Sequence, residues 1–410
     1  MSGGIVQLVA TGAQDTWLSG KPEISFFRSN YKRYTHYAAA PERQTIQGVP
    51  FPGSISTIRI EKKGDLLSYM YLTARDTNGA QVPNLDWMQV IDRIELLIGG
   101  QVIDMHDANY DLDVEPVVGA SNWSQRYMNN AGTIDGSTKP SNKRSSFYPF
   151  KFFFCKDWSV SLPLVALQYH DVEIRITWAG TLTNTIPTIN SVSTTYSSLN
   201  YQCWCNFVYL DQAEREYFAQ ATHDLLITQV QRVPIGQNAV QELALAQPVK
   251  FLAFQCVQYG TKYSSDGSSG NFGNQAGATN PPANYALKVQ INGVDVGESR
   301  PLPCWTDINQ YYHTPWGYLS NGSETPVLLI PYCLDTSKLQ PTGTLNFSRL
   351  DTYRLVVPNG LTNGLQGLTL AQTGGVGSGQ SGYVGTAYIY AVNYNVLRLQ
   401  KGMGSVLYAN

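Results

Sequence analysis

Apolar and polar residues alternate with a period of two along much of the chain. In the segment 172–178 the apolar positions are Val172, Ile174, Ile176 and Trp178. Successive side chains of a β-strand point to opposite faces, so this pattern predicts a strand with one buried face. Similar patterns predict strands in the segments 66–74 and 388–396, with the following residues on their buried faces: Leu66, Met70, Leu72 and Ala74; Tyr388, Tyr390, Val392, Tyr394 and Val396.

Two short turns predict hairpins. Gly99-Gly100-Gln101 follows the apolar run 94–98, and Asn292-Gly293 follows the run 287–291. Asn-Gly between alternating apolar residues is a strong hairpin signal, because both residues tolerate a positive φ. The two hairpins resemble each other, which is a first hint of a duplicated architecture. Strands and turns that recur along the whole chain predict an all-β sandwich or barrel rather than alternating βαβ units.

One segment has helical periodicity. Asp211 and Glu214 have the spacing of a capping box, in which each side chain satisfies a backbone N–H at the start of a helix. We therefore predict a helix over 211–223 that connects two β domains. Its apolar face would be formed by residues at four-residue spacing, Ala213, Tyr217, Ala221 and Leu225. Four polar, glycine-rich stretches predict long loops: Gly119–Ser146, Gly180–Asn200, Gly260–Asn284 and Asn359–Gly385.

The composition narrows the possible functions. The 410 residues include 28 Lys and Arg and 30 Asp and Glu, which gives a net charge of −2. This balance excludes a strongly basic nucleic-acid binder and an acidic tail protein. Charged residues are 14% of the chain, against about 25% in an ordinary soluble protein. A weakly charged surface repels copies of itself poorly, which favours a protein that assembles.

The sequence carries no recognisable targeting signal. The start, Met1-Ser2-Gly3-Gly4, lacks the basic and apolar regions of a secretory signal. We find no apolar run of the roughly 18 residues needed to span a bilayer. The six cysteines are few for this length. We therefore predict a cytosol-like compartment of synthesis, with the cysteines reduced and no disulfide among them.

Each pattern that could carry chemistry has a simpler structural interpretation. The glycine pattern over 377–382 matches a dinucleotide fingerprint but lies in a predicted loop without the flanking strand and helix. Cys203 and Cys205 are interpreted as core thiols rather than zinc ligands. An acidic cluster could hold a hard cation, but a solvated turn is the favoured interpretation: Asp104, His106, Asp107, Asp111, Asp113 and Glu115. Without a nucleophile, base and orienting group in one constellation, we predict no catalytic, cofactor-binding or metal-binding residue.

The N-terminal stretch 26–37 interleaves aromatic and basic side chains. The net charge of the chain argues against nucleic-acid binding, so we interpret this stretch as part of an arm that contacts other proteins, where Tyr and Arg are favoured. Sequons occur at Asn122, Asn321 and Asn346. Asn122 and Asn321 are the candidate glycosylation sites, although the missing secretory signal argues against conventional glycosylation.

Several blocks of sequence, spread from residue 3 to residue 410, resemble the major capsid proteins of large nucleocytoplasmic DNA viruses, those of chlorella viruses and iridoviruses in particular. The opening block, Gly3–Ala10, continues into Gly12-Ala13-Gln14-Asp15 and Leu18–Phe27. Later blocks occur in the same order along the chain: Ser161–Ile174, Leu210–His223, Gln340–Asp351, Asn393–Arg398, Gly402–Gly404 and Tyr408–Asn410. The sequence departs from the family mainly in the four long loops.

This resemblance implies two consecutive eight-stranded antiparallel jelly rolls with short connecting helices. We expect an N-terminal arm over 1–25, a first jelly roll over 26–210, a connecting helix over 211–224 and a second jelly roll over 225–410. Three copies would form a pseudo-hexagonal capsomer that tiles an icosahedral virion shell, assembled in the host cytoplasm and without any cofactor. The arm, with Gly12, Ala13, Gln14 and Asp15, would contact neighbouring capsomers and minor capsid proteins on the inner face.

The long loops would then lie on the outer face of the shell, where they could meet the host, and no specific contact with nucleic acid is expected. Two alternatives stay open. The chain could be a minor double-jelly-roll capsid paralogue. It could also be a β-sandwich that binds carbohydrate through loops containing Tyr and Trp. A tight trimer in solution supports a shell protein, whereas a monomer that binds sugar supports the latter alternative.

Overall fold

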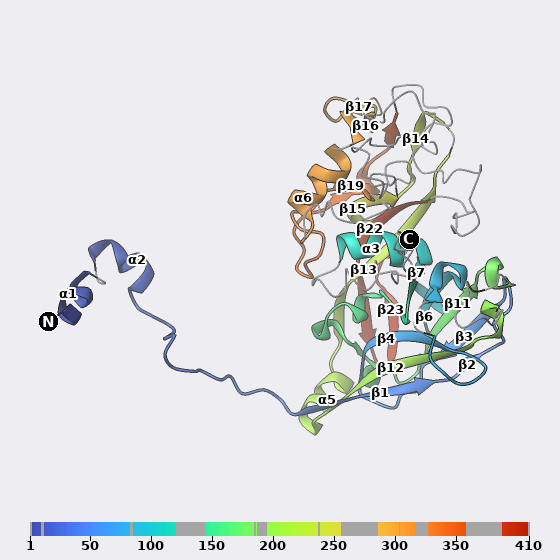
Figure 1. The fold of residues 1–410 in the computed structure, drawn as a ribbon, viewed down its shortest axis with the longest axis horizontal. Helices are drawn as coiled ribbons and strands as arrows, with labels where there is room; N and C mark the ends of the chain where they lie inside the picture. The colour runs from blue at the N-terminus through green and yellow to red at the C-terminus, as the bar shows by residue number, and fades with distance from the viewer. Residues whose placement is uncertain are drawn as a thin grey trace. The chain divides into compact units, whose positions relative to one another are not determined.

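The computed structural model describes residues 2–9, 12–82, 85–119, 144–183, 186, 195–236, 238–255, 286–302, 304–315, 327–357 and 388–408. The chain divides into two compact units, Met1–His36 and Tyr37–Asn410. Figure 1 shows the elements in chain order, and the larger unit consists mostly of antiparallel strands. Among the described residues, every helix is too short or too polar to cross a lipid bilayer.

The smaller unit has local helical structure. Its elements are α1 (Ser2–Val9), the 3₁₀ turn η1 (Ala13–Asp15) and α2 (Thr16–Ser19). The backbone N–H of Gly12 donates to Asp15 Oδ2 at 2.9 Å, and the N–H of Asp15 donates to the carbonyl of Gly12 at 3.0 Å. This reciprocal pair begins the turn. None of the residues of η1 and α2 is buried, so the unit forms no core of its own there.

The larger unit begins with a two-sheet sandwich. One sheet has the strand order β1 (Tyr37–Gln44), β12 (Asn200–Leu210), β4 (Leu66–Arg75) and β10 (Leu162–Pro163), with β9 (Phe147–Pro149) also paired to β4. The other has the order β2 (Ile46–Gln47), β3 (Ile55–Arg59), β11 (Val172–Trp178), β6 (Ile91–Ile98) and β7 (Gln101–Asp107). A separate short pair joins β5 (Leu85–Asp86) to β8 (Arg144–Ser145).

A second sandwich follows in the chain. Its larger sheet has the order β13 (His223–Pro234), β22 (Tyr388–Gln400), β15 (Pro248–Gln255) and β19 (Val327–Pro331), with β20 (Leu345–Asn346) on β15 and β23 (Met403–Val406) on β22. Its smaller sheet has the order β14 (Val240–Glu242), β21 (Tyr353–Val356), β16 (Ala286–Ile291) and β17 (Val294–Asp295), with β18 (Arg300–Pro301) on β16.

The two sandwiches have the same topology. Each sandwich has eight main strands in the described part of the chain, and we number them from one to eight in chain order. This numbering leaves out the additional short strands β2, β5, β8, β9, β18, β20 and β23. Both then have one sheet ordered 1-8-3-6 and a second ordered 2-7-4-5. The crossed connections that place the last strand beside the first are those of a jelly roll. The predicted all-β fold with two consecutive jelly rolls is confirmed.

Both predicted hairpins are confirmed, and both join the fourth strand to the fifth in their rolls. Gly99 and Gly100 have φ values of 58° and 82° between β6 and β7. Asn292 and Gly293 have φ values of 51° and 79° between β16 and β17. The similarity between the two hairpins therefore reflects equivalent positions in duplicated rolls.

The strand β11 has the predicted alternation, with its four apolar positions buried. The strand β4 departs from the prediction, because Leu67 and not Leu66 joins Met70 in the core. Opposite β12 the register shifts between the pairs Phe207–Leu67 and Cys205–Met70. This β-bulge adds one residue to β4, so the side chains before the bulge point to the opposite face from the one that strict alternation predicts. A pattern with a period of two therefore cannot predict that Leu67 is buried.

A helix does connect the rolls, but it is shorter than predicted. The helix α5 covers Gln212–Gln220, and the Asp211 carboxylate accepts from the N–H of Gln212 at 2.8 Å. The predicted apolar face is wrong, since α5 buries no residue and Tyr217 is 62% exposed. The chain becomes extended at Ala221, and Leu225 already belongs to β13, so the four residues cannot share a helical face.

Each roll also contains a short helical segment that follows its fifth strand. In the first roll a π-helical turn, η3 (Tyr110–Val114), leads into α3 (Glu115–Val118). In the second roll the π-helical turn η11 (Cys304–Ile308) leads into α6 (Asn309–His313). The remaining short helical turns are 3₁₀ segments between strands: η2 (Trp87–Gln89), η4 (Phe153–Cys155), η5 (Trp158–Val160), η6 (Leu164–Ala166), η7 (Gly180–Thr183), η8 (Tyr196–Ser198) and η12 (Phe347–Arg349).

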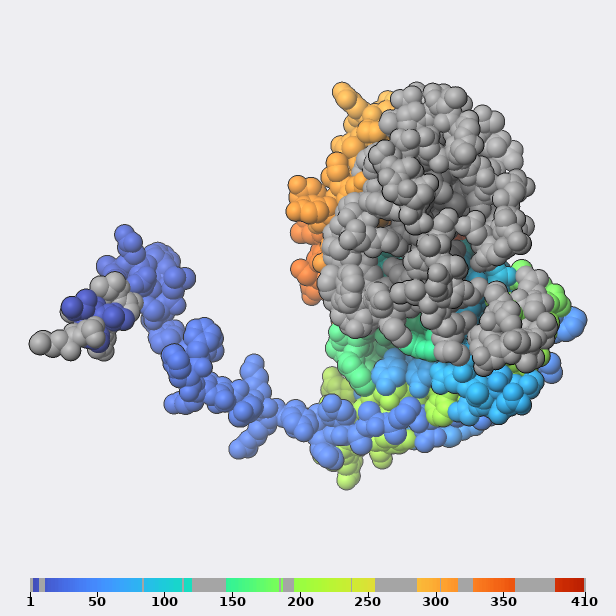
Figure 2. Space-filling model, in the orientation of Figure 1, coloured from blue at the N-terminus to red at the C-terminus, as the bar shows by residue number. Residues whose placement is uncertain are grey.

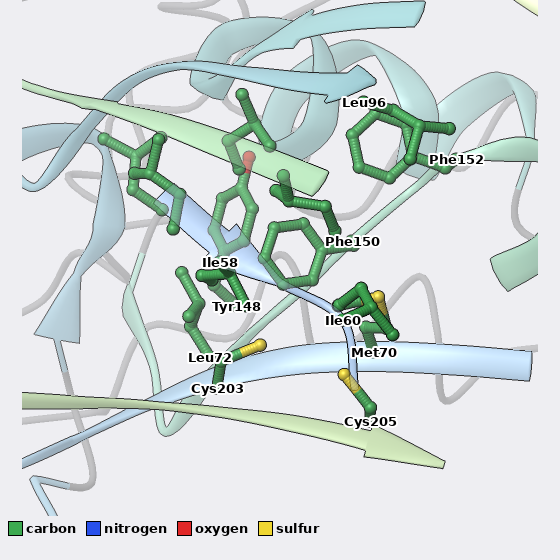
Figure 3. Packing of buried hydrophobic residues seen from close by; sticks show 14 of the residues in the cluster. Ile58, Ile60, Met70, Leu72, Leu96, Tyr148, Phe150, Phe152, Cys203 and Cys205 are labelled. Atoms are coloured by element: carbon green, nitrogen blue, oxygen red, sulfur yellow. The ribbon is translucent and has the colours of Figure 1, made fainter. Parts of the chain in front are cut away.

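Apolar side chains from both sheets fill each roll. In the first roll Met70, Leu72, Cys203 and Cys205 lie on one side of the cluster, and the rings of Tyr148 and Phe150 lie in its middle (Figure 3). The prediction that both thiols lie in the core is confirmed. Most fully buried side chains contribute about 1.5–3 kcal/mol each, so this cluster is the main source of stability of the roll.

Candidate functional site: the junction of the two rolls and the uncovered sheet

The junction between the rolls is built by η3 and α3. The buried side chains of Tyr110, Val114, Val117 and Val118 pack on the outer face of the larger sheet of the second roll. That face is formed by residues on the four main strands of the sheet: Val230, Phe251, Ala253, Val327, Leu329, Tyr390 and Val392. The strands alternate, so the same sheet turns its other side chains inward to the core of the second roll. A helix of one roll thus covers a sheet of the other.

A buried charged network lies beside this apolar contact. On β7, Asp104 and His106 are two residues apart and therefore on one face of the strand. His106 Nε2 lies 2.8 Å from Asp104 Oδ2, and its Nδ1 lies 3.0 Å from Asp111 Oδ1. All three side chains are 2% exposed. The second contact is an ion pair whose geometry is not that of a hydrogen bond.

The pKa of His106 follows from these neighbours. Burial by itself lowers the pKa of an imidazole, because it disfavours the charged form. The carboxylates of Asp104 and Asp111 outweigh burial and raise the pKa of His106 to about 10. The imidazolium therefore carries its charge throughout the neutral pH range. Tyr148 adds a neutral partner, since its hydroxyl donates to Asp111 Oδ2 at 2.6 Å.

The same network reaches across to the second roll. The Asp104 carboxylate accepts from the N–H of Val230 on β13 at 2.9 Å. The Tyr390 hydroxyl of β22 lies 2.8 Å from both oxygens of Asp107, and Arg232 Nη1 lies 3.4 Å from Asp107 Oδ2. Burial raises the pKa of Asp107 despite these partners. The carboxylates of the first roll thus fix the position of strands of the second.

Glu115, at the start of α3, is held in the same way. Its carboxylate is buried, and Lys151 Nζ lies 2.8 Å from its Oε2. Burial favours the neutral acid, but the charge of Lys151 outweighs it and lowers the pKa of Glu115. The ion pair ties α3 to the segment between β9 and η4.

The favoured interpretation of the acidic cluster as a solvated turn is wrong. Asp104, His106, Asp107, Asp111 and Glu115 are all buried. Charged side chains are almost never buried without partners. Here some partners lie within the cluster or nearby in the sequence, and those of Asp104 and Asp107 in the second roll are more than one hundred positions away. In the part of the chain that the structure describes, no group of three or more His, Cys, Asp and Glu is placed to hold a metal ion.

A second contact between the rolls lies at the end of the chain. The hairpin β22–β23 reaches the first roll (Figure 1), where Leu397 and Leu399 join the first hydrophobic core. The N–H of Tyr169 donates to the carbonyl of Gly402 at 2.9 Å. A Cβ on Gly404 would lie 2.8 Å from a terminal methyl carbon of Leu167, which shows how closely the hairpin packs on the first roll here.

Within the described residues, no helix covers the equivalent sheet of the first roll in this way. The outward side chains of β4 and β12 and the segment 147–158 form a groove of about 740 Å³. Its aromatic lining consists of Tyr69, Tyr71, Phe147, Phe150, Phe154, Trp158 and Trp204. Arg75, Lys151 and Lys156 also line it. Tyr69 is 40% exposed and Trp158 is 57% exposed. Their rings meet edge to face with centroids 5.7 Å apart.

Two further groups of apolar side chains are exposed. On η11 and α6 they are Ile308, Tyr311 and Tyr312. In the smaller unit, Trp17, Leu18, Phe26 and Phe27 are at least 90% exposed. Contiguous apolar surface of this kind marks sites where other molecules bind. Figure 2 shows α6, in orange, at the surface of the molecule.

Comparison with known proteins places these features in a family. A model described as "Major capsid protein N-terminus" matches residues 25–211, and one described as "Large eukaryotic DNA virus major capsid protein" matches residues 214–405. The chain is 30% identical over 450 residues to the major capsid protein of Paramecium bursaria Chlorella virus 1, with 100% of both chains covered. This chain belongs to the major capsid protein family of the large eukaryotic DNA viruses. The resemblance found in the sequence is confirmed.

Two further comparisons agree. The capsid protein is 30% identical over 429 residues to the major capsid protein of Pyramimonas orientalis virus, again with 100% of both chains covered. Its structure matches a chain of the quasi-atomic model of the PBCV-1 virus capsid, with a TM-score of 0.69 and 26% identity. That match covers 94% of this chain and 100% of the other, so both rolls are included.

The other candidate residues of the capsid protein are placed as follows. Gly12, Ala13, Gln14 and Asp15 form the capped turn at η1. The candidate glycosylation residues Asn122 and Asn321 lie outside the described residues, as does the glycine pattern over 377–382. Asn346 is exposed, and its side chain accepts from the N–H of Ser348.

Sequence reasoning missed the groove and the α6 surface of the capsid protein. The groove joins β4, β12 and residues 147–158, which only the fold brings together. The adjacent aromatic residues Tyr311-Tyr312 were the available signal for α6. They lie in a stretch without a clear period of two or of 3.6, so no pattern separated them from core residues.

Proposed function

We propose that this protein is the major shell-forming subunit of its virion and assembles as a homotrimeric, pseudo-hexagonal capsomer. In this proposal the arm over 1–25 precedes a first jelly roll over 26–210, a connector over 211–224 and a second jelly roll over 225–410. The trimers tile an icosahedral shell, and the protein acts by assembly rather than by catalysis. No cofactor is required, and no specific contact with nucleic acid is part of the function.

The observation that carries the trimer is the aromatic groove, which no described helix covers. A groove of about 740 Å³ on the outer face of one sheet exposes Tyr69 and Trp158. The matching face of the second roll is covered by α3. Tyr and Trp are enriched at the centres of protein interfaces, so the groove has the composition of a surface that another subunit buries. The low charge of the chain, 14% of residues, also favours assembly.

The arm and the long loops have separate roles in this proposal. The arm, with Gly12, Ala13, Gln14 and Asp15, contacts neighbouring capsomers and minor capsid proteins on the inner face. Its exposed Trp17 and Leu18 support this role, since these side chains find no core within the arm. The long loops face outward, toward the host. Assembly of the virion takes place in the host cytoplasm.

Sedimentation velocity at micromolar concentration tests the trimer. We expect one species of three times the chain mass of 45.3 kDa. The subunit interface should exceed the roughly 1,200–2,000 Å² of a standard contact. A monomer at this concentration would contradict the proposal. A gel of purified virions distinguishes a major from a minor paralogue, since a major subunit gives the dominant band near 45 kDa.

The groove also keeps one alternative function testable, because exposed Tyr and Trp rings are surfaces on which sugar rings stack. If the protein binds carbohydrate instead, the monomer should bind simple glycans with Kd values in the millimolar range or below, and Trp158→Ala should abolish that binding. A trimer that binds no glycan excludes this alternative.

A further inference from the structure

The helical segments of the two rolls are equivalent residue by residue. Both consist of a five-residue π-helical turn followed by a short α-helix. When the starts of the two turns, Tyr110 and Cys304, are aligned, three apolar positions coincide. These pairs are Val114 with Ile308, Val117 with Tyr311, and Val118 with Tyr312.

The members of each pair differ in burial. Val114, Val117 and Val118 are at most 3% exposed, because they pack on the sheet of the second roll. Ile308, Tyr311 and Tyr312 are 50%, 65% and 72% exposed. The same helical face is therefore used at the junction in one roll and left uncovered in the other.

The two sheets that could pack against such a helical face also differ from each other. In the second roll, the third and eighth strands present Phe251 and Val392 to α3, and these residues are cross-strand partners. In the first roll, the third and eighth strands present the cross-strand partners Tyr71 and Trp204 to the groove. In the described part of each chain, the face of α6 thus has no sheet against it and the grooved sheet has no helix against it.

We propose that the face of α6 formed by Ile308, Tyr311 and Tyr312 docks into the aromatic groove of a second copy of this chain. The contact repeats between subunits the packing that α3 makes within one chain. It is heterologous, because a helix on one subunit meets a sheet on the next. This inference rests on the proposed trimer, in which three internal junctions and three contacts between subunits would alternate around a closed ring of six rolls.

The helix is already fixed in position for this contact. Asn309 Nδ2 donates to the carbonyl of Leu329 at 2.7 Å, and Gln310 Nε2 donates to the carbonyl of Val327 at 2.7 Å. Both bonds tie the polar side of α6 to β19 of its own roll. The Tyr311 and Tyr312 rings meet edge to face at 5.0 Å. A preorganised aromatic face loses little conformational entropy on binding.

A mixing experiment with two double variants tests the contact. The helix variant is Tyr311→Ser with Tyr312→Ser, and the groove variant is Tyr69→Ser with Trp158→Ser. All four side chains are at least 40% exposed, so the fold of the monomer should survive. Each variant alone should sediment as a monomer, with affinity between subunits reduced at least about 100-fold, since aromatic side chains are frequent hot spots.

Mixing the two variants should restore one contact. The groove variant still offers an intact helix, and the helix variant still offers an intact groove. A heterologous contact therefore predicts a 1:1 dimer of twice 45.3 kDa that cannot close into a ring. An isologous contact, in which each patch meets its own copy, predicts no such dimer.

The matched control replaces two aromatic residues elsewhere on the surface, Phe51→Ser with Tyr217→Ser, which are 64% and 62% exposed. This variant should remain a trimer. If wild type is a trimer and the helix and groove variants also remain trimers, the contact is overturned while the proposed trimer stands. A monomeric wild type overturns both. If the N-terminal arm fills the groove instead, only the groove variant loses the trimer, which also overturns the contact.

Discussion

At the scale of single residues, the junction depends on charges that have left water. His106 is enclosed between Asp104 and Asp111, and all three side chains are 2% exposed. The attraction within such a group offsets the cost of burying it only while every member is present. Removal of one partner leaves a buried charge without compensation. The identity of His106 therefore matters far more than that of an exposed histidine.

We predict that His106→Gln lowers the free energy of unfolding by about 3–5 kcal/mol, because it leaves two like charges close together in a buried site. Urea denaturation monitored by tryptophan fluorescence measures this change. The matched control is His36→Gln, since His36 is exposed, and it should change stability by less than about 0.5 kcal/mol. Equal effects of the two variants would contradict the buried ion pair.

The pH dependence of this pair has a definite sign. The pKa of His106 in the folded protein, about 10, lies above its ordinary value of 6.5. The stabilisation is therefore complete below pH 6.5 and is lost as the pH rises toward 10, with a slope of at most about 1.4 kcal/mol per pH unit. Burial lowers the pKa of Lys250 to about 8. The contribution of Lys250 to the free energy of unfolding therefore increases as the pH rises above 8, opposite to that of His106. The difference between wild type and His106→Gln cancels the lysine contribution and should shrink as the pH rises.

The thiols provide a further prediction at this scale. The five cysteines in the described residues are free, and burial raises the pKa of Cys155 to about 12. A thiol with such a pKa is a poor nucleophile at neutral pH. Alkylation of the unfolded, unreduced protein followed by mass spectrometry should find all six cysteines modified. One native disulfide would refute the predicted reducing compartment.

At the scale of elements, strands and hairpins could be predicted from the sequence because their signals are local. The alternation in β11 and the Asn292-Gly293 turn depend only on neighbouring residues. The bulge in β4 could not be predicted, because it arises from the pairing with β12. The burial of Asp107 was missed for the same reason, since its partners Tyr390 and Arg232 are far away in the chain.

At Gly293 a substitution should strain the backbone without causing a steric clash. Its φ is +79°, and a Cβ at this position would meet nothing within 4 Å. Gly293→Val should therefore destabilise the second roll by about 1–2 kcal/mol through backbone strain, and impair folding or trimer formation. Gly293→Asn is the control, because Asn tolerates this conformation and should cost much less. An unchanged melting temperature for the valine variant would show that the turn is not formed.

At the scale of the whole molecule, the resemblance predicted the duplicated rolls and the family, and the two similar hairpins were a first hint of the duplication. They could not predict how one roll is joined to the other, because the junction combines α3 with four strands of the second roll. The groove was also beyond prediction, since it combines β4, β12 and the segment 147–158, which only the fold brings together. Both features follow from the arrangement of completed rolls rather than from any local pattern.

The arm provides the prediction at this scale. Deletion of residues 2–20 should leave a folded trimer with a melting temperature within a few degrees of wild type, because the residues of η1 and α2 bury nothing in the arm. The truncated trimer should fail to build closed capsids, as seen by electron microscopy of assembly reactions. A large loss of melting temperature would mean that the segment packs on its own jelly roll.

The hairpin β22–β23 has a consequence for the synthesis of the protein. Leu397 and Leu399 belong to the first hydrophobic core, and Ile227 joins them there from β13. Domains of many proteins fold as soon as they leave the ribosome, in order from the N-terminus. Here the first roll lacks part of its core until nearly the whole chain has emerged. A ribosome-bound chain that ends at residue 210 should accordingly be sensitive to protease, and protection should arise only after release of the completed chain.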